Sequence, residues 1–421
     1  MKAATMLWAV HISLAETNDI AMPQPPDNSA ARFTLLCLRG RFDPAALDTA
    51  REMARERDLN WGAWYETVAA EGLLPLLYRI LHGQGIIPNA IDAKLEAVYY
   101  QSLRRNALLF RELECVLHSL AAQQITVILL KGAALAETVY GNIALRPMDD
   151  LDLLVRHEDA RGALATLTAL GYTRMGPKEK RADAAIEFEI EAALRKPGPV
   201  NTQIEVHWGL LDSPYYQHRL PMTWFWETAR PLRVGGAEGL MLGAEAQILH
   251  LCAHLVLGHH GEGLRWLHDV AEVLYYDRGQ LDWDALLAKA QECDLVLPLK
   301  QVLSQVVEGW AVPIPPLALA RLSALQPSPE EIRVFNWLVS FDWDAQGGRT
   351  AARHFWADLV TLPGWRQRLR YAWSILFPSA AYMRQRYRVS HDGLLPLYYP
   401  YRWLIGLRGA IRLLSKRETE V

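Results

Sequence analysis

The sequence predicts an α+β fold that is mostly α-helical, with a small α/β core between N- and C-terminal helical regions. Three observations support this prediction. Apolar residues recur at helical spacing from Pro44 to about Leu120. Residues 125–130 are rich in β-branched side chains, as a buried strand is, and residues 149–155 alternate between apolar and polar as a second strand. From Ala244 onward the apolar spacing is helical again.

The length of 421 residues exceeds what one hydrophobic core comfortably serves, so we expect two or three domains. Changes in composition and apolar period suggest where they begin and end. We expect a loose N-terminal extension at 1–30, a helical region at 31–120, the α/β core at 121–240, a helical domain at 241–340 and a basic, aromatic C-terminal helical region at 341–421.

Individual elements follow from the same patterns. The N-terminal region should contain a long helix over 91–118. The only α/β stretch that we expect, about 90 residues long, contains a strand at 125–130, a helix at 133–140, a strand at 149–155, a helix at 157–170 and a hairpin with strands at 185–194 and 202–208. After it we expect helices over 244–274, 283–293 and 297–306.

The net charge of −3 does not indicate a nucleic-acid-binding protein, but it is the sum of two segments with opposite net charge. Residues 365–421 carry eleven basic and three acidic residues among many tyrosines and tryptophans, while residues 1–364 have a net charge of −11. Such a basic aromatic tail can bind RNA, lie on an anionic membrane or dock onto the acidic remainder of the chain. We expect the tail to dock onto the acidic remainder of the chain.

The four cysteines are far apart and form no Cys-x-x-Cys pair, which favours a reducing compartment. No apolar run is long enough for a transmembrane helix. Residues 3–15 have the length of a signal-peptide core but include His11 and lack a clean cleavage site. We therefore expect a cytoplasmic location.

Acidic residues are placed at strand spacing on two of the expected strands. Asp150 and Asp152 are two apart and share one face, and Glu205 shares a face with Gln203 and His207. If the strands are neighbours, the three carboxylates converge and repel unless a cation lies between them. They then form a hard-oxygen site for one or two Mg²⁺ ions, whereas the alternative is an ordinary solvated strand face.

A Lys-Gly pair follows the first strand where a phosphate would approach. Gly132 allows a close approach of the backbone, and the helix after it presents free N–H groups to an anion. Lys131 adds a positive charge, although a surface lysine at a strand end is equally ordinary. Arg146, just before the aspartate strand, is a further candidate for a phosphate contact.

Five histidines, His250, His254, His259, His260 and His268, suggest a second metal site. His250 and His254 lie one helical turn apart, but the glutamate of a His-Glu-x-x-His motif is absent. His268-Asp269 is similar to the ligand pair of HD-type phosphohydrolases. Arg265 and Asp269 lie on one helix face and can pair with each other or help close a nucleotide cleft. We expect these histidines to have packing roles.

Several segments together resemble one family. They are Val127–Leu135, Tyr140-Gly141, Leu145–Val155, Ile204–Trp208 and Leu264–Val270. The sequence resembles the uncharacterised bacterial nucleotidyltransferase family, within the DNA polymerase β-like nucleotidyltransferase superfamily, from about Thr34 to near the end. The resemblance implies a nucleotidyltransferase core with a mixed sheet, in which Asp150 and Asp152 are metal ligands and Glu205 is the third acid. One departure is that Lys131-Gly132-Ala133 stands where the superfamily usually has Gly-Ser.

The function predicted from the residues and the resemblance is a Mg²⁺-dependent nucleotidyltransferase. Asp150, Asp152 and Glu205 are predicted as catalytic residues and metal ligands, and Lys131, Gly132 and Arg146 as binding residues for an NTP such as ATP. An NMP group would pass to an acceptor hydroxyl on a protein, a small molecule or RNA, with release of pyrophosphate. Because the Gly-Ser hydroxyl is missing, the alternative is an inactive scaffold that binds a nucleotide or a partner. An HD-type metal phosphohydrolase is the weaker alternative.

Overall fold

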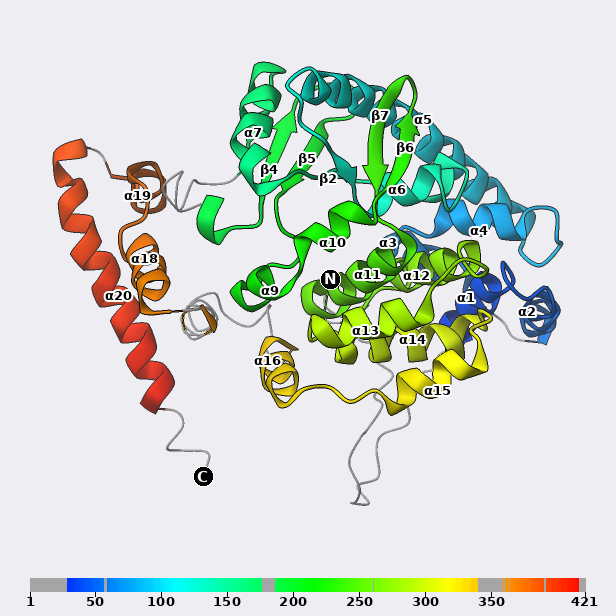
Figure 1. Ribbon diagram of the computed structural model, residues 1–421. Coiled ribbons are helices and arrows are strands. Elements are labelled where there is room, and N and C mark those ends of the chain that lie inside the picture. Colours follow the sequence, from blue (N-terminus) through cyan, green and yellow to red (C-terminus); the bar gives the residue numbers. More distant parts are fainter. Residues whose placement is uncertain are drawn as a thin grey trace.

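The computed structural model describes residues 29–56, 59–175, 186–259, 261–339, 359, 361–362, 364–389 and 391–415. The expected N-terminal extension and His260 lie largely or wholly outside these residues. Helices predominate and surround one mixed sheet, so the predicted α+β class is confirmed (Figure 1).

The sheet has seven strands in the order β3-β4-β5-β2-β1-β7-β6. Its central strand pair, β2 and β5, is parallel, as is the pair of β1 and β7, and the other neighbours are antiparallel. The strands are β1 (Ile128–Leu129), β2 (Asp150–Leu154), β3 (Thr173–Arg174), β4 (Glu191–Lys196), β5 (Thr202–His207), β6 (Arg230–Val234) and β7 (Ala237–Met241).

Two predictions about the strands were wrong. The α/β stretch does not end at residue 208, because the hairpin of β6 and β7 joins the sheet beside β1. Strand β1 covers only two of the six residues expected, because the chain turns at Lys131, whose φ is +47°. The hairpin of β4 and β5 was predicted correctly, but β4 begins at Glu191.

One face of the sheet is apolar and covered by helices. Leu151, Leu153, Ile204 and Val206 point into a core shared with α5 (Asn89–Ala121), α6 (Lys131–Glu137) and α7 (Ala160–Ala169). Side chains alternate along each strand, so the neighbouring acidic residues of β2 and β5 point to the other face. The core thus determines on which side of the sheet the acidic residues lie.

A second and larger core joins helices from both ends of the chain. Part of the N-terminal region, predicted at 31–120, and part of the region predicted at 241–340 are buried against each other in this core. Its helices are α1 (Ser29–Arg39), α2 (Ala45–Glu56), α3 (Trp61–Ala70), α4 (Leu74–Leu81), α11 (Ala244–His259), α12 (Leu264–Tyr276), α13 (Trp283–Glu292), α14 (Val296–Trp310), α15 (Pro316–Ala324) and α16 (Pro329–Val339).

Helix α5 connects the two cores. Its N-terminal half contributes Ile91 and Leu95 to the helical core, and its C-terminal half contributes Leu113 and Leu117 to the core under the sheet. At 33 residues it is about 50 Å long, enough to reach both. The helical stretch predicted over 244–274 consists of two helices, α11 and α12, because Gly261 and Gly263 adopt positive φ between them.

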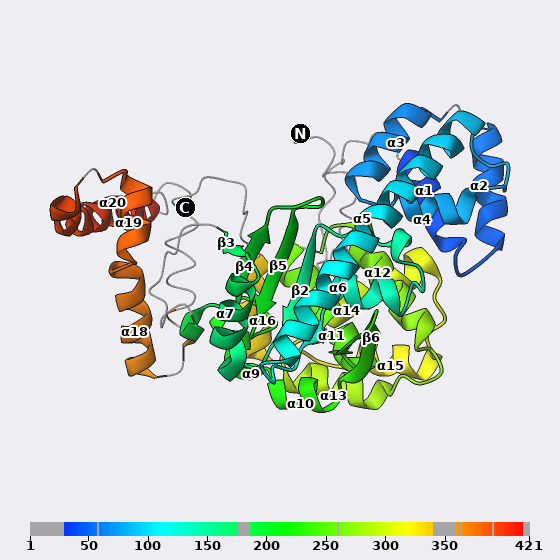
Figure 2. The same cartoon turned by 90° about the horizontal axis from the view of Figure 1, so that it is seen from above.

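The remaining elements are short connectors and a C-terminal arm. The connectors are η2 (Ile143–Leu145), η3 (His157–Asp159), α9 (Pro214–Arg219) and α10 (Met222–Glu227). The arm consists of α18 (Trp365–Leu376), α19 (Ala380–Tyr387), η4 (Asp392–Leu394) and α20 (Leu395–Ser415), and it projects from one end of the molecule (Figures 1 and 2). Among its described contacts with the body are the Arg370–Glu187 ion pair and the packing of Tyr371 on Phe188. None of the described helices is long and apolar enough to cross a membrane.

Candidate functional site

The parallel pairing of β2 and β5 brings the predicted acidic residues together. Asp152 lies directly across from Glu205, and Asp150 lies across from Gln203. The two aspartates and Glu205 therefore lie together on the sheet face opposite the apolar one. The structure thus places the three predicted metal ligands side by side.

Asp152 is buried but charged, because two cations contact it. The same Oδ1 atom lies 3.1 Å from Lys131 Nζ and 2.9 Å from His207 Nε2. Burial alone would raise the pKa of Asp152, but Lys131 and His207 outweigh it and hold the pKa well below its usual range. Asp152 is therefore ionised at neutral pH.

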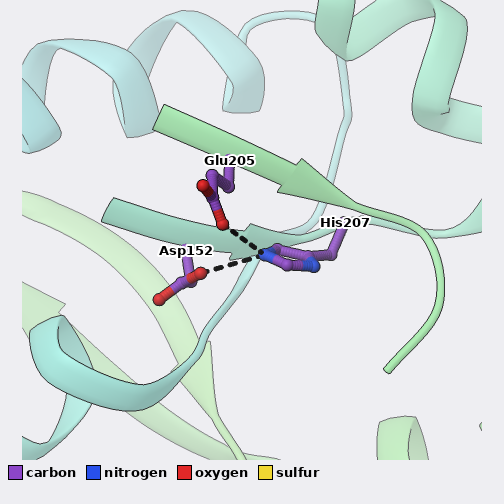
Figure 3. Close-up of side chains that lie close together, drawn as sticks. All are labelled: Asp152, Glu205 and His207. Atoms are coloured by element: carbon purple, nitrogen blue, oxygen red, sulfur yellow. Dashed lines mark hydrogen bonds and ion pairs between the residues drawn. The ribbon is translucent and has the colours of Figure 1, made fainter. Parts of the chain in front are cut away.

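His207 links three carboxylates, as Figure 3 shows for two of them. Its Nε2 lies near Asp152 and 3.8 Å from Glu205 Oε2, and its Nδ1 lies 3.0 Å from Glu191 Oε2. Burial alone would lower the pKa of His207, but its hydrogen bonds to Asp152 and Glu191 raise it to about 9. The imidazolium therefore donates hydrogen bonds on both sides.

Glu205 and Asp150 show the opposite electrostatic effect. Burial and the neighbouring carboxylates of Glu191, Asp152 and Asp150 raise the pKa of Glu205 to about 7. Burial and Asp152 raise the pKa of Asp150 as well. Negative charge thus accumulates on this face beyond what the side-chain cations neutralise, which is the electrostatic environment that binds a cation.

The donor atoms here are close enough to hold a metal ion. One atom each from Asp152, Glu205 and His207 lie within 4.8 Å of one another, and within the described part of the chain they are the sole such group. Carboxylate oxygens suit Mg²⁺, and Asp150 on the same face offers another. His207 would have to release its Nε2 proton before that nitrogen could bind a metal.

The lysine–glycine pair lies at the edge of this site. Lys131 begins helix α6, and its largely buried ammonium group rests on Asp152. Burial alone would lower the pKa of Lys131, but Asp152 raises it, so the residue stays charged. Gly132 is buried, and a Cβ atom there would lie 3.1 Å from Met148 Cγ. The tight packing under Met148 therefore accounts for the glycine.

Arg146 lies nearby, where its guanidinium group is buried in an ion pair. Its Nε and Nη2 donate to Asp269, with Nη2 2.8 Å from Oδ2, and Tyr140 donates to the same carboxylate. Asp269 therefore pairs with Arg146, whereas the sequence suggested Arg265 as one partner. The pair joins the loop before β2 to helix α12.

The buried histidines have individual surroundings. His268 contacts Trp310 and Glu272, and Asp269 contacts Arg146 and Tyr140. His254 Nε2 lies 3.1 Å from His259 Nε2. His250 is buried, and neither ring nitrogen has a hydrogen-bond partner among the described residues. The expected packing roles agree with these positions.

The sequence interpretation missed two participants in the site. The sequence placed His207 on the same strand face as Glu205 but did not assign it to the site. Its spacing of two residues from Glu205 was the signal that could have done so. Glu191 lies across from His207 in the antiparallel pair of β4 and β5. Only the register of that pair places it there, so no local spacing pointed to it.

Adjacent strands of a mixed sheet that present two aspartates and a third acid are what the sequence resemblance led us to expect of a nucleotidyltransferase. Residues 57–309 match the family model described as uncharacterised nucleotidyltransferase, and the chain belongs to this family. No curated protein matches the sequence. A crystal structure of an antigenic nucleotidyltransferase-like protein from Paracoccidioides brasiliensis is similar with a TM-score of 0.33 and 14% identity, covering 53% of this chain and 96% of that one. A likeness this weak carries no argument.

Proposed function

We propose that the protein is a Mg²⁺-dependent nucleotidyltransferase that transfers an NMP group from an NTP to an acceptor hydroxyl. The observation that carries the proposal is the register of β2 and β5, in which Asp152 faces Glu205 with Asp150 on the same face. Family membership supports the reaction class. The raised pKa values of Asp150 and Glu205 support a site that is completed by a cation.

Asp150, Asp152 and Glu205 would hold the metal ion. When bound, Mg²⁺ supplies positive charge that offsets the charge of the triphosphate. Lys131 and Gly132 lie beside Asp152 and are proposed to hold the triphosphate, the ammonium group as a point charge and the backbone by close approach. Binding of a triphosphate would draw Lys131 away from Asp152 toward the phosphates.

The reaction requires one bond to form and one to break. The acceptor oxygen attacks the α-phosphorus, and the bond from that phosphorus to the bridging oxygen of pyrophosphate breaks. Pyrophosphate leaves with the bonding electrons, and the acceptor proton must pass to a base. Glu205, which lies across from Asp152 at this site, is proposed to accept this proton.

The predicted phosphate contact of Arg146 stays a prediction. Its guanidinium is bound by Asp269, so contact with a phosphate requires this buried pair to open. We propose instead that Arg146 positions the loop that precedes β2.

The test is nucleotide transfer by Asp152→Asn, with Asp149→Asn as a matched control. Asp149 is exposed and directly precedes β2, so its variant loses the same charge without removing a proposed metal ligand. Purified protein is incubated with each labelled NTP and cell extract, and the label is then located. We expect Asp152→Asn to lower transfer at least about a hundredfold while Asp149→Asn retains it. Retained transfer in a folded Asp152→Asn protein contradicts the proposal.

A second candidate is a protein of the same family that binds a nucleotide or a partner without chemistry. Two observations favour it: Lys131 and His207 already neutralise Asp152, and Lys-Gly-Ala replaces Gly-Ser. Calorimetry with Mg²⁺ and an NTP separates the candidates when combined with a broad acceptor panel. Binding without turnover supports the second candidate, and turnover excludes it.

A further inference from the structure

The C-terminal arm exposes large apolar side chains along one face of helix α18. Trp365, Leu369, Trp373 and Leu376 are all exposed. At about 100° of rotation per residue they fall on a single stripe, which we call the α18 stripe. The opposite face carries the buried Tyr371, which packs on the body of the protein. The stripe therefore points away from the body.

Helix α20 repeats this arrangement. Leu397, Tyr401 and Leu404 are exposed and share one face, which we call the α20 stripe. The other face makes the internal contacts of the arm: Tyr399 donates to Pro378 O at 3.0 Å, and Trp403 Nε1 donates to Leu376 O at 2.8 Å. These hydrogen bonds hold the helix with its apolar stripe outward.

The two helices are connected through aromatic rings. Phe377 lies 4.0 Å from the ring centroid of Trp373, in the α18 stripe, and 5.1 Å from that of the exposed Trp403 on α20. These rings join the α18 stripe to the inner face of α20, opposite the α20 stripe. Monomeric proteins rarely expose apolar stripes of this kind unless the stripes bind something.

Positive charge borders the apolar surface. Arg366 flanks the α18 stripe, whereas Arg370 pairs with Glu187 of the body and Arg368 donates to Leu362 O. Beside the α20 stripe is a hollow of about 600 Å³, lined by Arg386 and Arg388 among others, together with Leu397 and Tyr401 from the stripe itself. A partner must therefore supply both apolar surface and negative charge.

We propose that α18–α20 is a docking surface for an anionic phospholipid membrane. The two stripes would enter the boundary between headgroups and acyl chains, and the arginines would contact lipid phosphates, with the hollow taking a headgroup. The exposed tyrosines and tryptophans suit the membrane–water interface. Such binding requires no spanning helix, in agreement with the described helices.

The charge distribution favours a membrane over the other partners. Residues 365–421 have a net charge of +8, so a second copy of the arm would be repelled. RNA supplies phosphates but offers no apolar surface that would bury the exposed leucines. The acidic body is the other source of negative charge within the chain, yet the face of α18 that packs on it is the one with Tyr371, opposite the α18 stripe.

The experiment uses the full chain and vesicle co-sedimentation. Vesicles of phosphatidylcholine alone are compared with vesicles that also contain phosphatidylglycerol. We expect affinity at least about tenfold higher for the anionic vesicles, and a decrease with added salt. The double variant Leu369→Ser/Leu397→Ser should lower the affinity about tenfold, and Arg386→Gln/Arg388→Gln should reduce the preference for anionic lipid.

Leu317→Ser is the matched control. Leu317 on α15 is 63% exposed, close to the 60% of Leu369 and the 67% of Leu397, but lies outside the arm. It should leave vesicle binding unchanged, and circular dichroism checks that each variant is folded. Equal binding to both vesicle types, or an equal loss in the control, overturns the proposal. Two other results overturn the proposal if the protein does not bind vesicles. One is self-association that the leucine double variant abolishes, and the other is RNA binding that this variant leaves intact.

Discussion

Asp152 is stabilised as an anion by residues that are far from it in sequence. Lys131 approaches from the start of α6 and His207 from the end of β5, and both contact the same carboxylate oxygen. Each cation keeps its proton despite burial because the carboxylate is there, as the raised pKa values of both residues show. Replacement of any of the three therefore leaves buried charge without its partner, which is costly.

His250 is the buried histidine whose surroundings are least satisfied. Both ring nitrogens lack a hydrogen-bond partner, and burial, Lys131 and His207 lower its pKa to about 3. A neutral, unpartnered imidazole in the core costs roughly 1–3 kcal/mol.

We predict that His250→Leu raises the free energy of unfolding by about 1 kcal/mol near pH 7. Between pH 6.5 and about 3 the unfolded chain binds a proton at His250 that the folded chain does not. The stability of the parent protein therefore falls as the pH falls, by up to about 1.4 kcal/mol per pH unit from this group. The variant lacks this dependence, so its advantage should grow at about pH 5.

Urea unfolding at the two pH values measures this difference. His118→Leu is the control, because His118 is exposed on α5 and its replacement should change stability by less than about 0.5 kcal/mol. A destabilised His250→Leu protein would mean that the imidazole has a partner in solution, and the prediction would be wrong.

Among the elements, helix α5 has a role beyond packing. Its buried Ser102 donates to Ala144 O, and its buried Asn106 donates to Ile143 O and, at 2.9 Å, to Arg146 O. These bonds hold the loop between α6 and β2, and hence the entry to the aspartate strand. The helix therefore positions the site without contributing a residue to it.

We predict that Asn106→Ala lowers the free energy of unfolding by about 2–3 kcal/mol, because two buried carbonyl groups lose their donor. Amide hydrogen exchange in residues 143–148 should rise more than exchange elsewhere. Gln101→Ala, an exposed amide on the same helix, is the control and should stay within about 0.5 kcal/mol. Unchanged exchange in the loop would show that other contacts hold it.

At the scale of the whole molecule, the N-terminal helices and α11–α14 are parts of one core. Phe33 on α1 is fully buried and packs edge-on against Trp61 and Trp64, and α1 lies against α14. The predicted domain boundaries at residues 120 and 241 thus lie between helices whose apolar side chains are buried in the same core.

We predict that Phe33→Ala costs about 3–5 kcal/mol and that amide exchange rises in α14 as well as in α1–α4. The half-buried Phe335 on α16 provides the control, because Phe335→Ala should cost clearly less. If exchange in α14 stays unchanged, the N-terminal helices form a separate folding unit.

Predictions that depend on residues close together in the sequence differed in outcome from predictions that depend on residues far apart in the sequence. Local spacing identified the α+β class, the long helix of the N-terminal region and the shared face of Asp150 and Asp152, because covalent geometry fixes side-chain direction over a few residues. The same reasoning missed β6 and β7, because these short strands gain their stability by pairing with each other and, through β7, with β1.

By itself, the sequence of this protein indicated candidate side chains for the chemistry and the face of their own strand or helix on which they lie. Only the tertiary structure decided which of them meet: Glu205 with Asp152, Glu191 with His207, and Asp269 with Arg146. Strand register and helix packing over long separations set these contacts, and they depend on the whole core. The physical reason is that the free energy of burial is shared among many residues, so no single segment determines these contacts.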